Sequence, residues 1–191
     1  MRREMISEIQ EATERINRLV GNVIEASRLE SGAVVPRFNE CAVGELIHVA
    51  LADVEKELSA HKVTVRIQPG LPVVPMDFVL MQQAVANLLS NAALHTRPGT
   101  PIEVTARLSG PRVVLWVADR GPGIPQESLP RIFDKFYRVS NSRTGGTGLG
   151  LSLVKGFVEA QGGQVTAENR PGGGAAFTIS LPRPVTAQVH A

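Results

Sequence analysis

Two asparagines in the segment QQAVANLLSNAALHT, Asn87 and Asn91, lie four residues apart in a stretch with helical apolar spacing. This separation places both side chains on one face of a helix. Amide oxygens suit Mg²⁺, which keeps several of its waters when it binds to a protein. The pair is therefore a candidate magnesium site, although two solvent-exposed asparagines would give the same pattern.

A second candidate is DRGPGI, residues 119–124, which directly follows the apolar run VVLWVA. An aspartate at the end of a strand, here Asp119, can accept a hydrogen bond from an exocyclic amine. Gly121 and Gly123 have no Cβ, so a flat ligand can approach their backbone closely. Taken alone, the segment would also suit a plain turn.

A third segment, GGTGLGL at 145–151, leads into a helical pattern. Gly148 and Gly150 leave backbone N–H groups exposed at the positive end of that helix, which favours phosphate binding. The order strand, G-x-G-x-x-G, helix of a dinucleotide-binding turn is not met, and the sequence contains no G-x-x-x-x-G-K-[ST] loop.

Sequence patterning also predicts the elements that must position these segments. Apolar periodicity predicts helices at 4–30, 43–60, 77–95 and 149–161, a short helix near 127–133, and Asp77 as a helix N-cap. Alternating and β-branched runs predict strands at 63–68, 101–108, 112–118, 164–169 and 175–181, with a loop at 69–75. Their order predicts an α+β two-layer sandwich, in which helices cover one face of a mixed five-stranded sheet.

The first helix has an apolar seam with coiled-coil spacing, formed by Met5, Ile9, Ala12, Ile16, Leu19, Val23 and Ala26. This regularity favours packing in a bundle or dimer over packing on the helix's own domain. An exposed stripe of this length would be an association surface. Gly32 and Pro36 end the helix, and residues 31–42 are interpreted as a linker.

Composition excludes several classes of protein. The 191 residues are 43% hydrophobic and carry a net charge of +2, which argues against disorder and against a nucleic-acid partner. The single cysteine, Cys41, excludes an internal disulfide and a four-cysteine zinc site. No apolar window is long enough to span a membrane, and the charged N-terminus is not a signal peptide.

In this order and spacing, the three segments resemble the N, G1 and G2 boxes of the GHKL ATPase superfamily, which includes histidine kinases, gyrase, MutL and Hsp90. IFDKFYR at 132–138 resembles the F box of sensor histidine kinases, and the helix at 4–30 resembles the second helix of their dimerisation and phosphotransfer hairpin. GFVEAQGG, AENRPGGGA and RLVGNVIEASRLESG are most similar to the potassium-responsive KdpD subfamily. The resemblance covers residues 5–182 and implies the GHKL (Bergerat) sandwich.

The resemblance also implies roles for individual residues. Asn87 and Asn91 would be the catalytic pair that holds Mg²⁺ on the phosphates of ATP, and Asp119 would bind the adenine amino group. The base pocket would include Gly121, Gly123 and Ile124, and Phe133 and Phe136 would anchor a lid with its body at 138–147. The phosphate cradle would include Gly146, Thr147, Gly148, Leu149 and Gly150. For Thr147 and Ser152, simple helix capping is an open alternative, and Leu149 is favoured as a packing residue.

Two positions depart from the family pattern. Many of these kinases have a lysine three residues after the second asparagine, followed by an aromatic residue, where this chain has Leu94 and His95. His95 would contact a phosphate or pack beside the adenine. Candidates for the missing positive charge are Lys135, Arg138 and Arg143, each of which would otherwise be a solvated lid charge.

The family's phosphoacceptor histidine lies in an H-[ED]-x-[RK]-x-P setting, which none of His48, His61, His95 and His190 has. We therefore expect the chain to begin after the acceptor helix, to bind Mg-ATP and not to phosphorylate itself. The expected division is a partial hairpin (1–30), a linker (31–42), an ATP-binding domain (43–182) and a tail (183–191). Asn87 favours a kinase over the ATP-hydrolysing relatives, because they have a glutamate there and an amide cannot act as a general base.

The expected partners are the upstream phosphoacceptor helix, a response regulator and a second copy of the protein. The expected location is the cytoplasmic part of a membrane-anchored sensor. Three alternatives stay open: a GHKL ATPase that acts as a conformational switch, an anti-sigma-factor serine kinase, and a dimerisation module with a degenerate nucleotide pocket.

Overall fold

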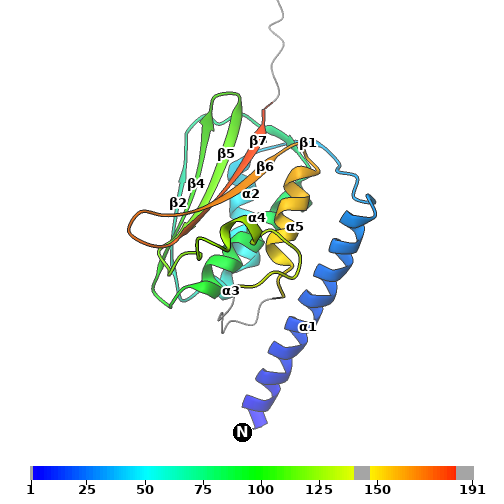
Figure 1. The fold of residues 1–191 in the computed structure, drawn as a ribbon, viewed down its shortest axis with the longest axis vertical. Coiled ribbons are helices and arrows are strands. Elements are labelled where there is room, and N and C mark those ends of the chain that lie inside the picture. The colour runs from blue at the N-terminus through cyan, green and yellow to red at the C-terminus, as the bar shows by residue number, and fades with distance from the viewer. Residues whose placement is uncertain (1, 140–146, 184–191) are drawn as a thin grey trace, which may run out of the picture.

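A five-stranded mixed sheet forms one layer of the computed structural model, which describes residues 2–139 and 147–183 (Figure 1). Its strand order is β2-β4-β5-β7-β6, in which β2 and β4 are parallel and the other neighbours are antiparallel. The strands are β2 (Lys62–Ile67), β4 (Pro101–Ser109), β5 (Arg112–Asp119), β6 (Gln164–Asn169) and β7 (Ala175–Pro182). The predicted α+β sandwich is confirmed.

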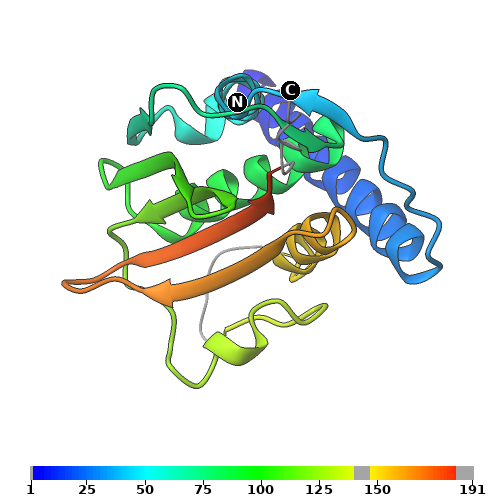
Figure 2. The same cartoon turned by 90° about the horizontal axis from the view of Figure 1, so that it is seen from above.

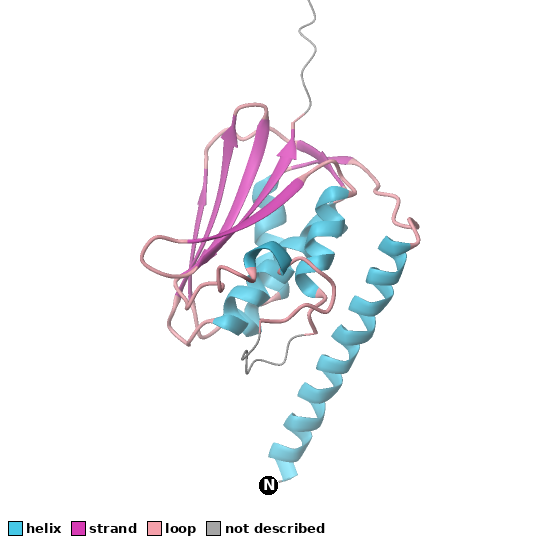
Figure 3. Cartoon of the chain, in the orientation of Figure 1, coloured by secondary structure: helices cyan, strands magenta, loops and turns pink. Residues whose placement is uncertain are grey.

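Helices lie on one side of this sheet and form the second layer (Figure 3). They include α2 (Val43–Asp53), α3 (Glu55–Leu58), α4 (Phe78–His95) and α5 (Gly150–Glu159). Strand β4 shows the division between the two faces of the sheet, because Ile102, Val104 and Ala106 are fully buried while Glu103 and Thr105 are only partly buried. The core therefore lies between the helices and this face, and on β4 the other face carries polar side chains.

The N-terminus of α4 is fixed by Asp77, as predicted. Its Oδ1 accepts hydrogen bonds from the backbone N–H groups of Val79 and Leu80, which caps the helix. Its Oδ2 accepts from the N–H of Arg37, and its own N–H donates to the Gln161 side chain. Three segments are thus joined at the start of the helix that carries the two candidate asparagines.

Two predicted helices differ in the structure. The predicted helix at 43–60 is broken at Val54, which has φ −115° and ψ 22°, so that α2 and α3 are separate. Val54 and Leu58 are both buried on either side of this break. The short helix predicted near 127–133 is only a 3₁₀ turn, η1 (Leu129–Arg131), in which Pro130 supplies no N–H donor.

A small two-stranded sheet was missed by the sequence analysis. Strand β1 (Asn39–Cys41) pairs antiparallel with β3 (Val74–Met76), and these segments had been interpreted as linker and loop. Each strand has three residues and the partners lie far apart in the sequence, so neither shows an alternating pattern by itself. Part of the predicted linker therefore joins the sandwich.

The long helix α1 (Arg2–Glu30) runs outside α5, at the edge of the helical layer (Figure 2). Its C-terminal end packs on α5, where Leu29 occupies the space left by Gly156, and Ala26 is buried. Of the predicted seam, Ile9, Ile16 and Val23 are each more than half exposed. The side chains of Met5 and Ala12 are not among those described.

Candidate functional site

Asp119 is the last residue of β5 and its side chain is almost completely buried. Its Oδ1 accepts hydrogen bonds from the backbone N–H of Gly121, at 2.7 Å, and of Ala175, at 3.3 Å. Within the described residues, Oδ2 makes no hydrogen bond. The carboxylate is thus held by one oxygen, and the other remains available to a donor on a ligand.

The two glycines after Asp119 are required by their protein neighbours. A Cβ at Gly121 would lie 2.7 Å from the methyl group of Thr96 and 3.0 Å from Asp119 Oδ1. Gly123 has φ +78°, and a Cβ there would lie 2.8 Å from Asn169 Oδ1. The loop after β5 therefore lies tightly between the end of α4 and the turn that joins β6 to β7.

That turn contributes residues that the sequence analysis missed. Asn169 holds Ile124 through both of its amide atoms, accepting from the Ile124 N–H at 2.7 Å and donating to the Ile124 carbonyl at 2.6 Å. A Cβ at Gly174 would overlap the carbonyl oxygen of Asp119. The available signal was the run NRPGGG, whose three glycines all have positive φ.

Asn87 and Asn91 both lie on α4 and both are half-buried. Neither amide is hydrogen-bonded within the part of the chain that the structure describes. A Cβ at Gly150 would lie 3.6 Å from Asn87 Oδ1, so this amide faces the first residue of α5. The first asparagine and the predicted phosphate cradle are therefore adjacent in space, although 63 positions separate Asn87 from Gly150 in the sequence.

The N-terminus of α5 has no side-chain cap in the described structure. Its first backbone N–H groups are consequently available to an anion. Thr147 Oγ1 accepts from the Leu149 N–H at 3.2 Å, and Ser152 Oγ donates to the Leu149 carbonyl at 2.8 Å. Both hydroxyls thus make local contacts, as in the capping alternative, and the burial of Leu149 agrees with packing.

The two ends of the predicted lid are tied together. The N–H of Phe136 donates to the Gly148 carbonyl at 2.9 Å, and a Cβ at Gly148 would lie 2.7 Å from the Phe136 backbone. Phe133 packs the edge of its ring on Phe177, whereas Phe136 is 70% exposed and has φ +60°. Gly146 and Arg143 lie outside the described residues, as does most of the lid body.

The described structure does not single out one residue as the source of the positive charge expected near the phosphates. His95 lies close to Asp119 and Arg138: desolvation lowers the pKa of His95, the Asp119 carboxylate opposes this change, and Arg138 adds to it. His95 thus lies on the Asp119 side of the candidate site. Lys135 forms an ion pair with Glu30 of α1, and Leu94 is exposed.

Two cavities border these elements. One, of about 470 Å³, lies between α1, α3, α4 and α5 and has Asn87 in its wall. The other, of about 140 Å³, lies between α1 and the pair Phe136 and Leu149. Neither cavity is lined by Asp119, so α1 contacts the asparagine and lid side of the site rather than the base side.

The sandwich, the carboxylate at the end of β5 and the uncapped start of α5 define an ATP-binding domain of the GHKL type. Residues 76–185 match the family described as histidine kinase-, DNA gyrase B-, and HSP90-like ATPase, and the chain belongs to this family. Over 95% of its length it is 34% identical to sensor protein KdpD of Clostridium acetobutylicum, of which it covers 21%. It spans about a fifth of the length of the first curated relatives.

The solved structures that resemble this chain include histidine kinases. The mycobacterial sensor histidine kinase MprB is 30% identical with a TM-score of 0.69, over 78% of this chain and 99% of that one. Full-length ShkA, solved in complex with AMPPNP, is 26% identical with a TM-score of 0.81, over 95% of this chain and 38% of that one. The chain thus carries the ATP-binding catalytic domain of the sensor histidine kinases, with KdpD among its relatives.

Proposed function

We propose that this chain is the catalytic part of a KdpD-like sensor histidine kinase, which transfers the γ-phosphoryl group of ATP to a histidine outside residues 1–191. The observation that carries the proposal is the approach of Asn87 to Gly150. It brings a metal-binding type of side chain to a helix N-terminus suited to phosphate. Since an amide cannot take a proton from water, this pairing supports phosphoryl transfer over hydrolysis.

The side chains of Asn87 and Asn91 would hold Mg²⁺. Both are neutral oxygen donors and neither is engaged within the described residues, so the donor set fits a cation that keeps waters and shares the phosphates. The bound ion would neutralise charge on the phosphate oxygens. No group of three or more His, Cys, Asp and Glu side chains suited to a metal occurs among the described residues, which agrees with such a shared site.

The remaining residues would bind and orient the nucleotide. Asp119 Oδ2 would accept from the adenine amine, while the N–H groups at the start of α5 would bind phosphate oxygens. Phosphoryl transfer depends mainly on such positioning. Two histidines of the chain are engaged elsewhere: the ring of His48 contacts the Gly44 carbonyl, and that of His61 the Thr96 hydroxyl. This supports an acceptor from outside the chain.

The proposal assigns α1 to the second helix of the dimerisation and phosphotransfer hairpin. The match to full-length ShkA supports this, because it extends over 95% of the chain. The partners would then be the acceptor helix, a second copy and a response regulator, in the cytoplasmic part of a membrane-anchored sensor. Among the described residues, no helix is long and apolar enough to cross a bilayer.

Calorimetric titration with ATP and ADP, with and without Mg²⁺, tests this function. Asp119→Asn should weaken binding by about 2 kcal/mol, because it removes a charged acceptor from a buried hydrogen bond. Asn91→Ala should abolish the Mg²⁺-dependent part of the affinity and leave the rest. Asn39→Ala on β1 is the matched amide control and should bind as the unmodified chain does.

Two results would overturn the proposal. Failure of the unmodified chain to bind either nucleotide would point to the degenerate dimerisation module. Rapid ATP hydrolysis would instead point to the conformational-switch ATPase.

A further inference from the structure

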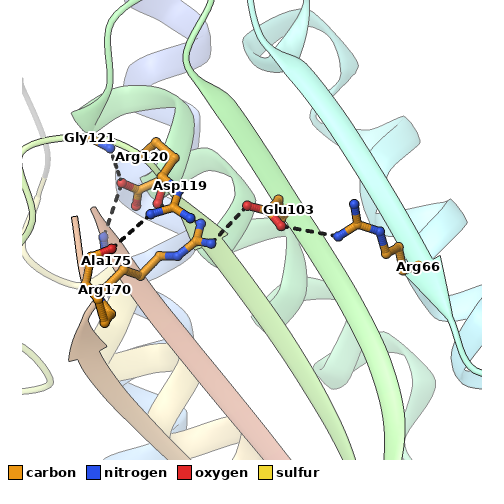
Figure 4. A network of polar contacts seen from close by, with 8 residues as sticks. Arg66, Glu103, Asp119, Arg120, Gly121, Arg170 and Ala175 are labelled. Carbon is orange, nitrogen blue, oxygen red and sulfur yellow. Dashed lines mark hydrogen bonds and ion pairs between the residues drawn. The ribbon is translucent and has the colours of Figure 1, made fainter. Parts of the chain in front are cut away.

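Arg170, the first residue after β6, lies on the face of the sheet opposite the helices (Figure 4). Its side chain is 11% exposed although it comes from a turn. Nη1 donates to the backbone carbonyl of Asp119 at 3.1 Å, and Nη2 pairs with Glu103 Oε1 on β4 at 3.0 Å. The guanidinium also lies over the Trp116 ring, 4.8 Å from its centre. One side chain thus links the turn after β6 to β5 and β4.

Small residues on β7 and β5 allow the Arg170 side chain to extend over the sheet as far as β4. The row of paired residues that runs from β6 to β4 contains Ala176 of β7 and Ala118 of β5, followed by Glu103. Both alanines are 1% exposed, yet neither belongs to the core beneath the helices. Their burial is expected if the Arg170 side chain lies across them. Larger residues in this row would obstruct the path to Glu103.

On the side of β7, the carbonyl of Asp119 needs a donor from outside the ladder, because pairing between β5 and β7 ends just before it, while Asp119 still pairs with Ile102 of β4. The last pair between β5 and β7 is Ala118 with Ala176, so β7 provides no ladder partner for the next carbonyl. Arg170 supplies a donor there, and the backbone of Gly174 blocks movement of the same carbonyl in another direction. Fixing this carbonyl also fixes the origin of the Asp119 side chain, whose Oδ1 is held by Gly121 and Ala175.

We propose that Arg170 is a positioning residue for adenine recognition: from the opposite face of the sheet, it holds the main chain of Asp119 so that the carboxylate points at the base. Glu103 orients the guanidinium, and Trp116 supports its plane. This proposal rests on the proposed function, which assigns the adenine amine to Asp119. It adds a determinant of base specificity that does not itself touch the base.

The test compares the affinities of ADP and inosine diphosphate, whose base carries a carbonyl oxygen in place of the exocyclic amine. The unmodified chain should bind ADP more tightly. Arg170→Met should reduce the ADP affinity about tenfold and change the inosine diphosphate affinity little, because only the contact with the amine depends on the position of Asp119. A purely structural role would lower stability, or weaken both ligands alike, and would leave the ratio unchanged.

Two further variants complete the design. Arg170→Lys keeps the charge but cannot reach the carbonyl and Glu103 with a planar fork, so it should lose the discrimination as Arg170→Met does. Arg66→Met is the matched control, because Arg66 pairs with the other oxygen of Glu103 at 3.4 Å, is 69% exposed and makes no described contact with Asp119. It should retain the full ratio.

The outcomes separate the two proposals. If the unmodified chain does not prefer ADP, the assignment of Asp119 fails, and the positioning role fails with it. If it prefers ADP and either Arg170 variant, folded by circular dichroism, keeps the preference, only the positioning role is overturned.

Discussion

At the residue scale, Asp119 shows how one carboxylate can be both structural and available. Its Oδ1 is used by the protein, through Gly121 and Ala175, and its Oδ2 remains for a ligand. The neighbouring glycines pack closely on Thr96 and Asn169, and in the proposed function they would also allow a flat base to approach. Substitutions in this loop should therefore affect folding and binding together. Arg170 lies on the opposite face of the sheet, so its substitution should change ligand preference without disturbing the packing of this loop.

His95 gives a pH-dependent prediction for the nucleotide-free chain. Its pKa is lowered in the folded state by desolvation, with an opposing contribution from Asp119, so the unfolded chain binds more protons as the pH falls below about 6.5. Stability should thus decrease from pH 7 to pH 5 more steeply than in His95→Gln. Urea unfolding of both proteins at several pH values measures this, and parallel curves would contradict the prediction.

Gly148 gives a prediction about the lid attachment. It has φ +72°, and a Cβ there would meet the Phe136 backbone, whereas Gly162 has φ +70° with open space around it. Gly162→Ala should cost about 1–2 kcal/mol from backbone conformation alone. Gly148→Ala should cost at least about 1 kcal/mol more, because the backbone it meets cannot move freely. Denaturant unfolding measures both, and equal losses would show that the contact with Phe136 is not tight.

At the element scale, the described contacts of α1 with the domain are concentrated in its last turns. Leu29 packs against Gly156, Glu30 pairs with Lys135, and Ala26 is buried, whereas Ile9, Ile16 and Val20 are each more than half exposed. A surface ion pair contributes little by itself, so the contact with α5 depends mainly on Leu29 and Ala26. The exposed apolar residues of α1 form a face on which another helix could pack.

That face predicts concentration-dependent self-association. Ile16 is 57% exposed and lies in the seam, whereas the exposed Asn17 lies beside it. Ile16→Glu should weaken association at least tenfold, since burial of an isoleucine contributes about 1.5–3 kcal/mol. Asn17→Glu adds the same charge and should associate as before. Sedimentation equilibrium measures this, and a monomer at all concentrations with α1 protected from hydrogen exchange would refute it.

At the scale of the whole molecule, the helical layer carries the asparagines and the start of α5, and the sheet edge carries Asp119. In the proposed function, the nucleotide would bind where these two layers meet and would contact residues from both. The described chain also places α1 against the asparagine and lid side through the two cavities.

The absence of a phosphoacceptor setting around any of the four histidines gives a prediction for the whole molecule. Incubation with radiolabelled ATP should leave no acid-labile phosphohistidine on this chain, because none of its four histidines has the acceptor setting. A second protein that carries the acceptor helix should become labelled when it is added, and Asp119→Asn should reduce that labelling. Phosphohistidine on the chain alone would overturn this expectation.

Much of the fold could be predicted because its signals are local. The alternation in β4 and β5, the Asp77 cap and the spacing of Asn87 and Asn91 each occupy one short segment, and the structure agrees with all of them. The pairing of β1 with β3 could not be predicted, because three-residue strands have no usable period. The roles of Asn169 and Arg170 were missed because their partners lie 45 and 51 residues away.

The sequence by itself determined the class of this protein, since the order and spacing of the asparagines, the DRGPGI segment and the glycine-rich segment are properties of the chain. The resemblance carried by these segments implies that Asn87 stands where the ATP-hydrolysing relatives have a glutamate. Strand pairing and layer packing decide which oxygen of Asp119 is held by the protein, that Asn87 faces Gly150, and that Arg170 contacts both the Asp119 carbonyl and Glu103. The physical reason is that local patterns follow backbone periodicity, whereas these contacts arise only when strands pair and layers pack.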